Sequence, residues 1–546
     1  MVGNGWRRCA KGRISVKPPL KETQTANQQI AKAAGTVMVA FILSNLIGLV
    51  RGVVITGAFG TSAELDSFNA ANRIVEVLFN LVAGGALGSA FIPAFTGFLT
   101  RDDRKGAWQL ASGVTNLIFL VLVLISILAW IFAPQIVRDG LYLLVPESDP
   151  VQETLTVELL RIMLPSVVIF GISGIVMGIL NAHQVFLIPA LAPAMYSLGM
   201  ISGILLLPET WGIQRLAVGV VAGALMHLLV QLPRTRRLPE RAYRLYLGIK
   251  DEAVLQVFKL MGPRLLGVAV VQINFIVNTI IALGQPEGSV TAITLAFSLM
   301  LMPQMAVAQS AAIASLPTFS AQASLGQWDE MRRSLASTLR AVLLLAIPAT
   351  AGLILLRYPL VQVLYQRGAF TERSTTLVAW ALLFYALGLV GHALVEILSR
   401  AFYALQDTRT PVVVGVIAMG LNIGFSLLFA NWFVKIGWLP HGGLALANSL
   451  ATALESIVLV VLMRKRLKGL EGRFIWQGVA VALLGTGLMS AVVLGWQRLF
   501  ARSAQWLSLL GAVTIGGVVY VALMGLLKMP ELTGMARALL RKIKRT

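Results

Sequence analysis

Five polar residues recur along one long apolar stretch, and their types could line a ligand cavity. Asp66, Asn69, Arg73, Glu76 and Asn80 are separated by steps of three and four residues. That spacing places all five side chains on one face of a helix. The face could form the wall of a hydrated cavity, or it could be a self-neutralising seam between packed helices in which Arg73 pairs with Glu76.

Two arginines and one serine in other apolar stretches could contribute to the same cavity. Arg51 lies in an otherwise apolar run, and its partner could be Asp66 or a bound anion. Arg264 follows Pro263 and could instead extend to the cytoplasmic membrane interface. Ser298 could serve helix packing as readily as ligand binding.

A second polar set lies closer to the C-terminus and consists mainly of amide and hydroxyl side chains. Asn422 and Ser426 are one helical turn apart in one apolar run, and Asn448 and Thr452 are one turn apart in the next. Glu455 shares the face of Asn448 and Thr452. The side chains of Asn422, Ser426, Asn448 and Thr452 could coordinate a monovalent cation, although polar residues that only pack helices together have the same pattern.

The elements that must position these residues are membrane-spanning helices. The 546 residues are 57% hydrophobic and 13% charged, whereas soluble chains average about 45–50% apolar and about 25% charged residues. The apolar runs are about 20 residues or longer, which suffices to cross a hydrocarbon core of about 30 Å. They must be helical, because lipid offers the backbone no hydrogen-bond partner. We predict an all-α polytopic membrane protein with about fourteen transmembrane helices: 33–58, 65–98, 109–133, 154–182, 184–207, 212–232, 253–284, 289–320, 335–356, 374–404, 410–433, 442–463, 474–498 and 505–528.

Basic residues predict the orientation of these spans. The formal net charge is +21, and Lys and Arg cluster before the first span and after the second, sixth, eighth, twelfth and last spans. If the spans alternate, these clusters all lie on one side, and the positive-inside rule places both termini in the cytoplasm. The loop with Arg357, Arg367 and Arg373 is an exception. Topology explains the charge and no basic domain with interleaved aromatic residues occurs, so we do not expect nucleic acid as a partner.

The sequence lacks the usual signatures of an enzyme. No Walker-type phosphate-binding loop is present, and the four histidines are scattered without the spacing of a metal site. The single Cys9 excludes an internal disulfide and a multi-cysteine metal site. We therefore expect a transporter without a cofactor or bound metal.

An internal repeat predicts two lobes. The motif around Pro93 recurs around Pro317, and three further motif pairs recur at nearly the same offset. The unit is six helices, so both copies enter the membrane in the same orientation and form two pseudo-symmetric bundles with a site between them. We predict a basic cytoplasmic tail, an N-lobe, a basic cytoplasmic linker, a C-lobe, two C-terminal helices and a second basic cytoplasmic tail: residues 1–32, 33–233, 234–252, 253–466, 467–530 and 531–546.

Three stretches resemble the MurJ (MviN) lipid II flippase family, within the superfamily that also holds multidrug and polysaccharide-lipid exporters. They are Arg51–Pro93, Leu180–Pro193, and Arg367–Thr371 together with Arg400–Pro411. The last stretch carries the most specific motifs, and the resemblance extends over nearly all of residues 33–530. The fourteen helices and two six-helix lobes that the resemblance implies agree with those predicted independently from the apolar runs and the internal repeat.

The resemblance implies a concrete function. Members of the family move lipid II, an undecaprenyl-diphosphate-linked disaccharide-pentapeptide, from the inner to the outer leaflet of the bacterial inner membrane for peptidoglycan synthesis. A cationic cavity between the lobes takes the head group, and a groove formed by the last two helices takes the prenyl tail. Transport proceeds by alternating access, helped by the membrane potential or a cation gradient. The head-group candidates in this chain are Arg51, Asp66, Asn69, Arg73, Glu76, Asn80, Arg264 and Ser298.

The sequence departs from the family pattern at charged positions. Basic residues are usual in the family where this chain has Asn45, Phe79 and Asn80, and of the family's charged set only Arg51 and Asp66 keep their positions. The alternatives are a flippase for another polyprenyl-linked oligosaccharide, a small-molecule exporter of the same superfamily, and a non-transporting membrane scaffold.

Overall fold

The computed structural model describes residue 40 and residues 42–81, 90–145, 149–239, 242–500, 504–527 and 529, without the side chains of residues 263, 264 and 266. Every regular element in these ranges is a helix, which confirms the predicted class. Within these ranges, eleven helices are long and apolar enough to cross a membrane, or up to thirteen if each of two bent pairs is one span. We predicted about fourteen. The further predicted span, 65–98, is divided between α2 and α3, and residues 82–89 between them lie outside the described ranges.

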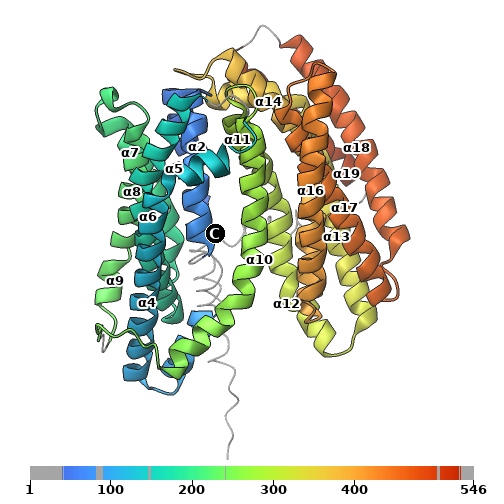
Figure 1. Ribbon diagram of the computed structural model, residues 1–546. Coiled ribbons are helices and arrows are strands. Elements are labelled where there is room, and N and C mark those ends of the chain that lie inside the picture. Colours follow the sequence, from blue (N-terminus) through green and yellow to red (C-terminus); the bar gives the residue numbers. More distant parts are fainter. Residues whose placement is uncertain are drawn as a thin grey trace, which may run out of the picture.

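The first group of helices matches the predicted N-lobe and lies on one side of the molecule (Figure 1). Helix α6 is central to it, because it packs against α2, α4 and α8. Phe91, Phe95 and Ile118 are fully buried in the hydrophobic cluster that joins these helices. The elements are the first span (Ile42–Phe59), α2 (Ala63–Phe79), α3 (Ile92–Thr100), α4 (Arg104–Ile131), α5 (Ala133–Gln135), η3 (Ile136–Leu141), α6 (Pro150–Ala182), α7 (Leu187–Leu206), η4 (Glu209–Trp211), α8 (Gln214–Leu229) and α9 (Leu232–Arg236).

The second group matches the predicted C-lobe and the two C-terminal helices. Helix α17 packs against α14, α15 and α16, and α18 and α19 pack against each other and against α13. The elements are α10 (Glu252–Leu283), α11 (Ser289–Gln304), η5 (Met305–Gln309), α12 (Ser310–Ser324), α13 (Trp328–Tyr365), α14 (Glu372–Leu387), α15 (Leu389–Ala404), α16 (Arg409–Lys435), α17 (His441–Arg466), α18 (Gly472–Leu499) and α19 (Gln505–Leu526).

A bend between α14 and α15 shapes the interior of this second group. The two helices meet at 46°. A Cβ atom at Gly388 would lie only 2.9 Å from the Cα atom of Ser449 in α17, so glycine is required for this close approach. The Ser449 hydroxyl donates a hydrogen bond of 2.7 Å to the carbonyl of Phe384. The bend therefore fixes α15 along α17.

The two groups approach each other at one end of the molecule. In Figure 1, α2, α11 and α14 meet at the upper end, whereas α4 and α12 lie apart at the lower end. Hydrogen bonds tie α2 to α11 at the upper end, and the predicted polar face of α2 begins there. We call the two groups the lobes from here on.

Candidate functional site

Asp66 joins the two lobes by capping a helix of the opposite lobe. Its carboxylate accepts hydrogen bonds from the backbone N–H groups of Gly288 (2.8 Å) and Thr291 (2.7 Å) and from the Thr291 hydroxyl (2.6 Å). The first N–H groups of a helix have no partner within it, and a negative charge there is favourable. Asp66 is only 7% exposed, so water does not compete for these donors. It therefore holds the start of α11 against α2.

Further contacts surround Asp66 and close the same end of the molecule. The amide of Asn69 donates to the Thr291 hydroxyl at 2.9 Å. The N–H of Ala63 donates to the Glu287 carboxylate at 3.0 Å. The hydroxyls of Thr61 and Ser374 lie 2.8 Å apart, and the N–H of Ala369 donates to the Gly57 carbonyl at 2.9 Å. We call this set the interlobe latch: Gly57, Thr61, Ala63, Asp66 and Asn69 on one side, and Glu287, Gly288, Thr291, Ala369 and Ser374 on the other.

One glycine makes the latch possible. Gly368 has a φ of +58°, which L residues with a side chain rarely adopt. A Cβ atom built on Gly368 would collide with the carbonyl oxygen of Gly57. The loop after α13 can therefore approach the first span only with glycine at this position.

Arg73 and Glu76 form the ion pair that the sequence left open. Their nearest atoms, Nη1 and Oε2, are 2.7 Å apart, and the side chains are 21% and 42% exposed. The Asn72 amide also donates to Glu76, at 3.0 Å. The Arg73 guanidinium lies 5.1 Å from the ring centroid of Phe275 in α10, so this face of α2 points toward the other lobe. The charge of Arg73 is thus neutralised within α2, although its Nε atom is buried without a hydrogen-bond partner.

Arg51 forms no ion pair within the part of the chain that the structure describes. Its Nη1 atom donates to the Ser197 hydroxyl at 3.5 Å, and its guanidinium lies 5.9 Å from the ring centroid of Tyr196. The Asp66 carboxylate, which we considered as a partner, is occupied by α11 instead. Tyr196 lies within electrostatic reach of both Arg51 and Glu76, so Arg51 and the Arg73–Glu76 pair belong to one region.

The positions of the other head-group candidates, Asn80, Ser298 and Arg264, give no evidence for or against a role in binding. Asn80 follows the end of α2 and is half-buried. Ser298 is exposed on α11, and its hydroxyl donates to the carbonyl of Thr294 at 2.9 Å. The side chain of Arg264 lies outside the described part of the structure. All eight candidates remain predictions as binding residues.

The four residues predicted to hold a cation fall into two separate pairs. Asn422 and Ser426 of α16 bond to Asn274 and Asn278 of α10, at 3.3 Å and 3.0 Å. The Ser426 hydroxyl also lies 3.1 Å from the side-chain amide oxygen Oδ1 of Asn422, to which it can donate. The sequence pattern gave only a weak sign of the contact with α10: Asn274 and Asn278 have the same four-residue spacing as Asn422 and Ser426.

The second pair lies on α17. Asn448 bonds to the ring Nε2 of His392 in α15 at 3.1 Å, and Thr452 is buried. Among the described residues no hydrogen bond connects this pair with Asn422 and Ser426, and no group of three or more His, Cys, Asp or Glu side chains could hold a metal ion. A cation site at these four residues therefore remains a prediction.

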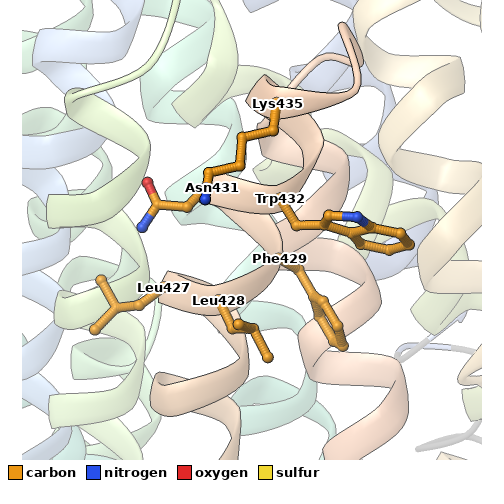
Figure 2. A pocket seen from close by; sticks show the side chains of 6 residues that line it. All are labelled: Leu427, Leu428, Phe429, Asn431, Trp432 and Lys435. Atoms are coloured by element: carbon orange, nitrogen blue, oxygen red, sulfur yellow. The ribbon is translucent and has the colours of Figure 1, made fainter.

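A hollow is lined only by residues of α16. It lies at the C-terminal end of α16, where the rings of Phe429 and Trp432 lie together and the side chain of Lys435 extends toward Asn431 (Figure 2). Leu427, Leu428 and Asn431 complete its lining. Aromatic rings beside a basic residue are typical of a helix end at the membrane–water interface. None of the predicted site residues borders this hollow.

Relatives of this chain are known from sequence. The family model described as "Lipid II flippase MurJ" matches residues 55–514. A lipid II flippase MurJ from Burkholderia cenocepacia is 30% identical over 488 residues, which are 87% of this chain and 92% of that protein. A probable lipid II flippase MurJ from Vibrio cholerae is 30% identical over 524 residues, which are 92% of this chain and 97% of that protein.

Solved structures show the same fold. A lipid II flippase MurJ in an inward closed conformation superposes with a TM-score of 0.75 at 24% identity, and the match covers 90% of this chain and 98% of that one. An inward-facing multidrug transporter of the MATE family superposes with a TM-score of 0.66 at 16% identity, over 80% of this chain and 99% of that one. The expectation of a multi-pass membrane transporter rather than an enzyme is confirmed. The chain belongs to the lipid II flippase MurJ family.

Proposed function

We propose that this chain flips lipid II from the inner to the outer leaflet of the bacterial inner membrane by alternating access. The observation that carries the proposal is the asymmetry of the contacts between the lobes. The interlobe latch ties them together at one end. Among the described residues other than Arg104, Glu153 and Arg340, by contrast, no hydrogen bond joins residues 92–239 to residues 305–500. In each of the two states of alternating access, one end of a transporter is closed and the other end is free to admit or release substrate.

The charge distribution supports an outward position for the latch. The ends of the spans opposite the latch carry basic residues, such as Arg104 and Lys105 at the start of α4 and Arg464, Lys465 and Arg466 at the end of α17. The positive-inside rule places this end in the cytoplasm, together with both termini. The region between the lobes would then be entered from the cytoplasmic leaflet, where lipid II is made.

Arginines between the lobes suit a diphosphate head group. Guanidinium groups bind phosphate oxygens bidentately and stay charged. Among the described residues Arg51 has no carboxylate partner, so it is ready to bind a phosphate. Arg73 would have to exchange Glu76 for the substrate. On this proposal Asp66 and Asn69 act in the latch, and their effect on transport comes from control of the closed state.

Energy for the cycle would come from the membrane potential or a cation gradient. Binding of a monovalent cation at Asn422, Ser426, Asn448 and Thr452 requires their oxygens to turn away from present partners such as Asn278. Such a change would couple α10, α16 and α17. This part of the proposal stands on the sequence pattern alone.

Complementation tests the proposal in cells. The chain is expressed in bacteria depleted of their own lipid II flippase, beside Arg51→Ala and Arg73→Ala variants at matched membrane levels. We expect growth with the parent chain and loss of growth with Arg51→Ala. Exposed Arg498→Ala, in the last turn of α18, serves as an arginine control that should still grow, because α18 packs against α13 and α19 of its own lobe. Absence of rescue by a correctly inserted parent chain would contradict lipid II flipping and favour another polyprenyl-linked sugar or a scaffold role.

A further inference from the structure

Glu455 is an acidic residue deep within a membrane-spanning helix. Helix α17 extends from His441 to Arg466, so at about 1.5 Å per residue Glu455 lies roughly 21 Å from one end and roughly 16 Å from the other. Within the described part of the chain its carboxyl group has neither a hydrogen bond nor an ion pair. An ionisable side chain at such a depth is expensive and is usually retained for function.

A glycine of the neighbouring helix faces the carboxyl group. Glu455 is half-buried between α17 and α16. A Cβ atom built on Gly415 of α16 would lie 3.4 Å from the Oε1 atom of Glu455. The lack of a side chain at Gly415 leaves room for the carboxyl group without offering it a polar partner.

Charged groups on the surrounding helices are engaged elsewhere. Glu396 and Arg400 of α15 pair with each other at 3.0 Å, and His392 bonds to Asn448. The charged side chains of α14 and α16 lie toward helix ends, and α11 has none. They are Glu372 and Arg373, and Arg409 and Lys435, respectively. Helix α10 has Glu252, Lys259 and Arg264 in its N-terminal half, and the side chain of Arg264 lies outside the described part of the structure. Among the described side chains, none forms an ion pair with Glu455.

We propose that Glu455 is a proton-binding site that couples the movement of the lobes to a proton gradient. The inference rests on the proposed transport function. Uptake of one H⁺ by the carboxylate forms a neutral carboxylic acid, which fits the unpaired position seen here. Release of the same H⁺ leaves a charge that is stable only when water reaches the carboxylate. The conformation with the latch closed is therefore the protonated state. Opening of the latch brings water to the carboxylate and accompanies loss of the proton.

Infrared spectroscopy of the full-length protein in liposomes tests proton binding without any substrate. The probe is the carbonyl stretch of protonated carboxyl groups, recorded as the pH is raised. We expect one component that disappears with rising pH in the parent chain and is missing in Glu455→Gln. Glu396→Gln is the matched control, because Glu396 is already paired with Arg400, and it should keep the component. An unchanged spectrum in Glu455→Gln would overturn the proposal.

A second variant protects the test against failure to fold. If Glu455→Gln does not insert into the membrane, Glu455→Asp can be used, because it retains a carboxyl group on a side chain that is one methylene shorter. Glu455→Asp should shift the frequency of the carbonyl stretch that disappears with rising pH. A spectrum identical to that of the parent chain would again overturn the proposal.

A transport measurement separates the proton site from the proposed function. Proteoliposomes with fluorescent lipid II are prepared with and without an imposed pH gradient. The parent chain should flip at a rate that depends on the gradient, and Glu455→Gln should lose that dependence. If the parent flips no lipid II but its carboxyl component titrates, the flippase proposal fails and the proton site stands. If it flips lipid II at a rate that ignores the gradient, the coupling proposal fails.

Discussion

Removal of the Asp66 carboxylate should open the interlobe latch. Replacing an N-cap residue by alanine costs about 0.5–2 kcal/mol, and Asp66 satisfies two backbone N–H groups and one hydroxyl of α11 rather than a single donor. In the open state water takes over these bonds, so the full strength of each bond is not lost. We expect Asp66→Ala to destabilise the closed state by about 2–3 kcal/mol, which lowers the ratio of closed to open molecules about 30- to 150-fold.

Distances between spin labels can report this change. Labels are placed at exposed Glu209 and Thr376, one in each lobe, after replacement of Cys9 by serine. Glu209 belongs to η4 just before α8, whose Arg215 lies against the ring of Phe59 near the latch. Thr376 is in α14, close to Ser374. Asp66→Ala should move most of the population from short to long distances.

Matched variants separate the latch from general damage to α2. Glu64 lies in the same first turn as Asp66 but is exposed, so Glu64→Ala should leave the distances unchanged. Asp66→Asn keeps one acceptor oxygen and should fall between the parent and Asp66→Ala. If Asp66→Ala gives the same distance distribution as the parent chain, the latch does not depend on this carboxylate and the reasoning is refuted.

Two further predictions concern ionised side chains. Glu76→Gln should free Arg73 and tighten the binding of fluorescent lipid II up to about fivefold, the effect of a partly exposed ion pair; weaker binding than in the parent chain would show that Glu76 itself holds the substrate. Hydrogen bonds from the N–H and hydroxyl of Thr410 hold the pKa of Asp407, in the loop before α16, below its usual value. The resulting stability is fully present above the unfolded pKa of about 3.9 and is lost as the pH falls through the lower folded pKa. The difference in Tm between the parent and Asp407→Asn should therefore shrink below about pH 4, and a constant difference would contradict this cause.

The sequence predicted those features that depend on local pattern. Hydropathy placed a span at 410–433, and α16 extends from Arg409 to Lys435. The three- and four-residue spacing along α2 correctly grouped its polar residues on one face, and proximity in that pattern anticipated the pairing of Arg73 with Glu76. The polar face and the ion pair are visible because a helix repeats every 3.6 residues.

Features that depend on the packing of distant helices were missed. The partners of Asp66 are backbone groups of Gly288 and Thr291, and a backbone N–H carries no signature in sequence. For the same reason Arg51 was assigned to Asp66 or an anion, when its described contacts are Ser197 and Tyr196 of α7. The bonds between α10 and α16 had a weak signal in the matching spacing of their polar residues, but spacing alone does not say which helices meet.

A reversible lock on the latch gives the most direct test of alternating access by this chain. The hydroxyls of Thr61 and Ser374 are 2.8 Å apart, so a double Thr61→Cys, Ser374→Cys variant in a Cys9→Ser background should form a disulfide across the lobes. Flipping of fluorescent lipid II is then measured in proteoliposomes, with the single Thr61→Cys variant as control. The account predicts that flipping stops when the disulfide forms and returns when it is reduced. Equal flipping in the locked and reduced protein, or none in the reduced protein and the parent chain, would contradict it.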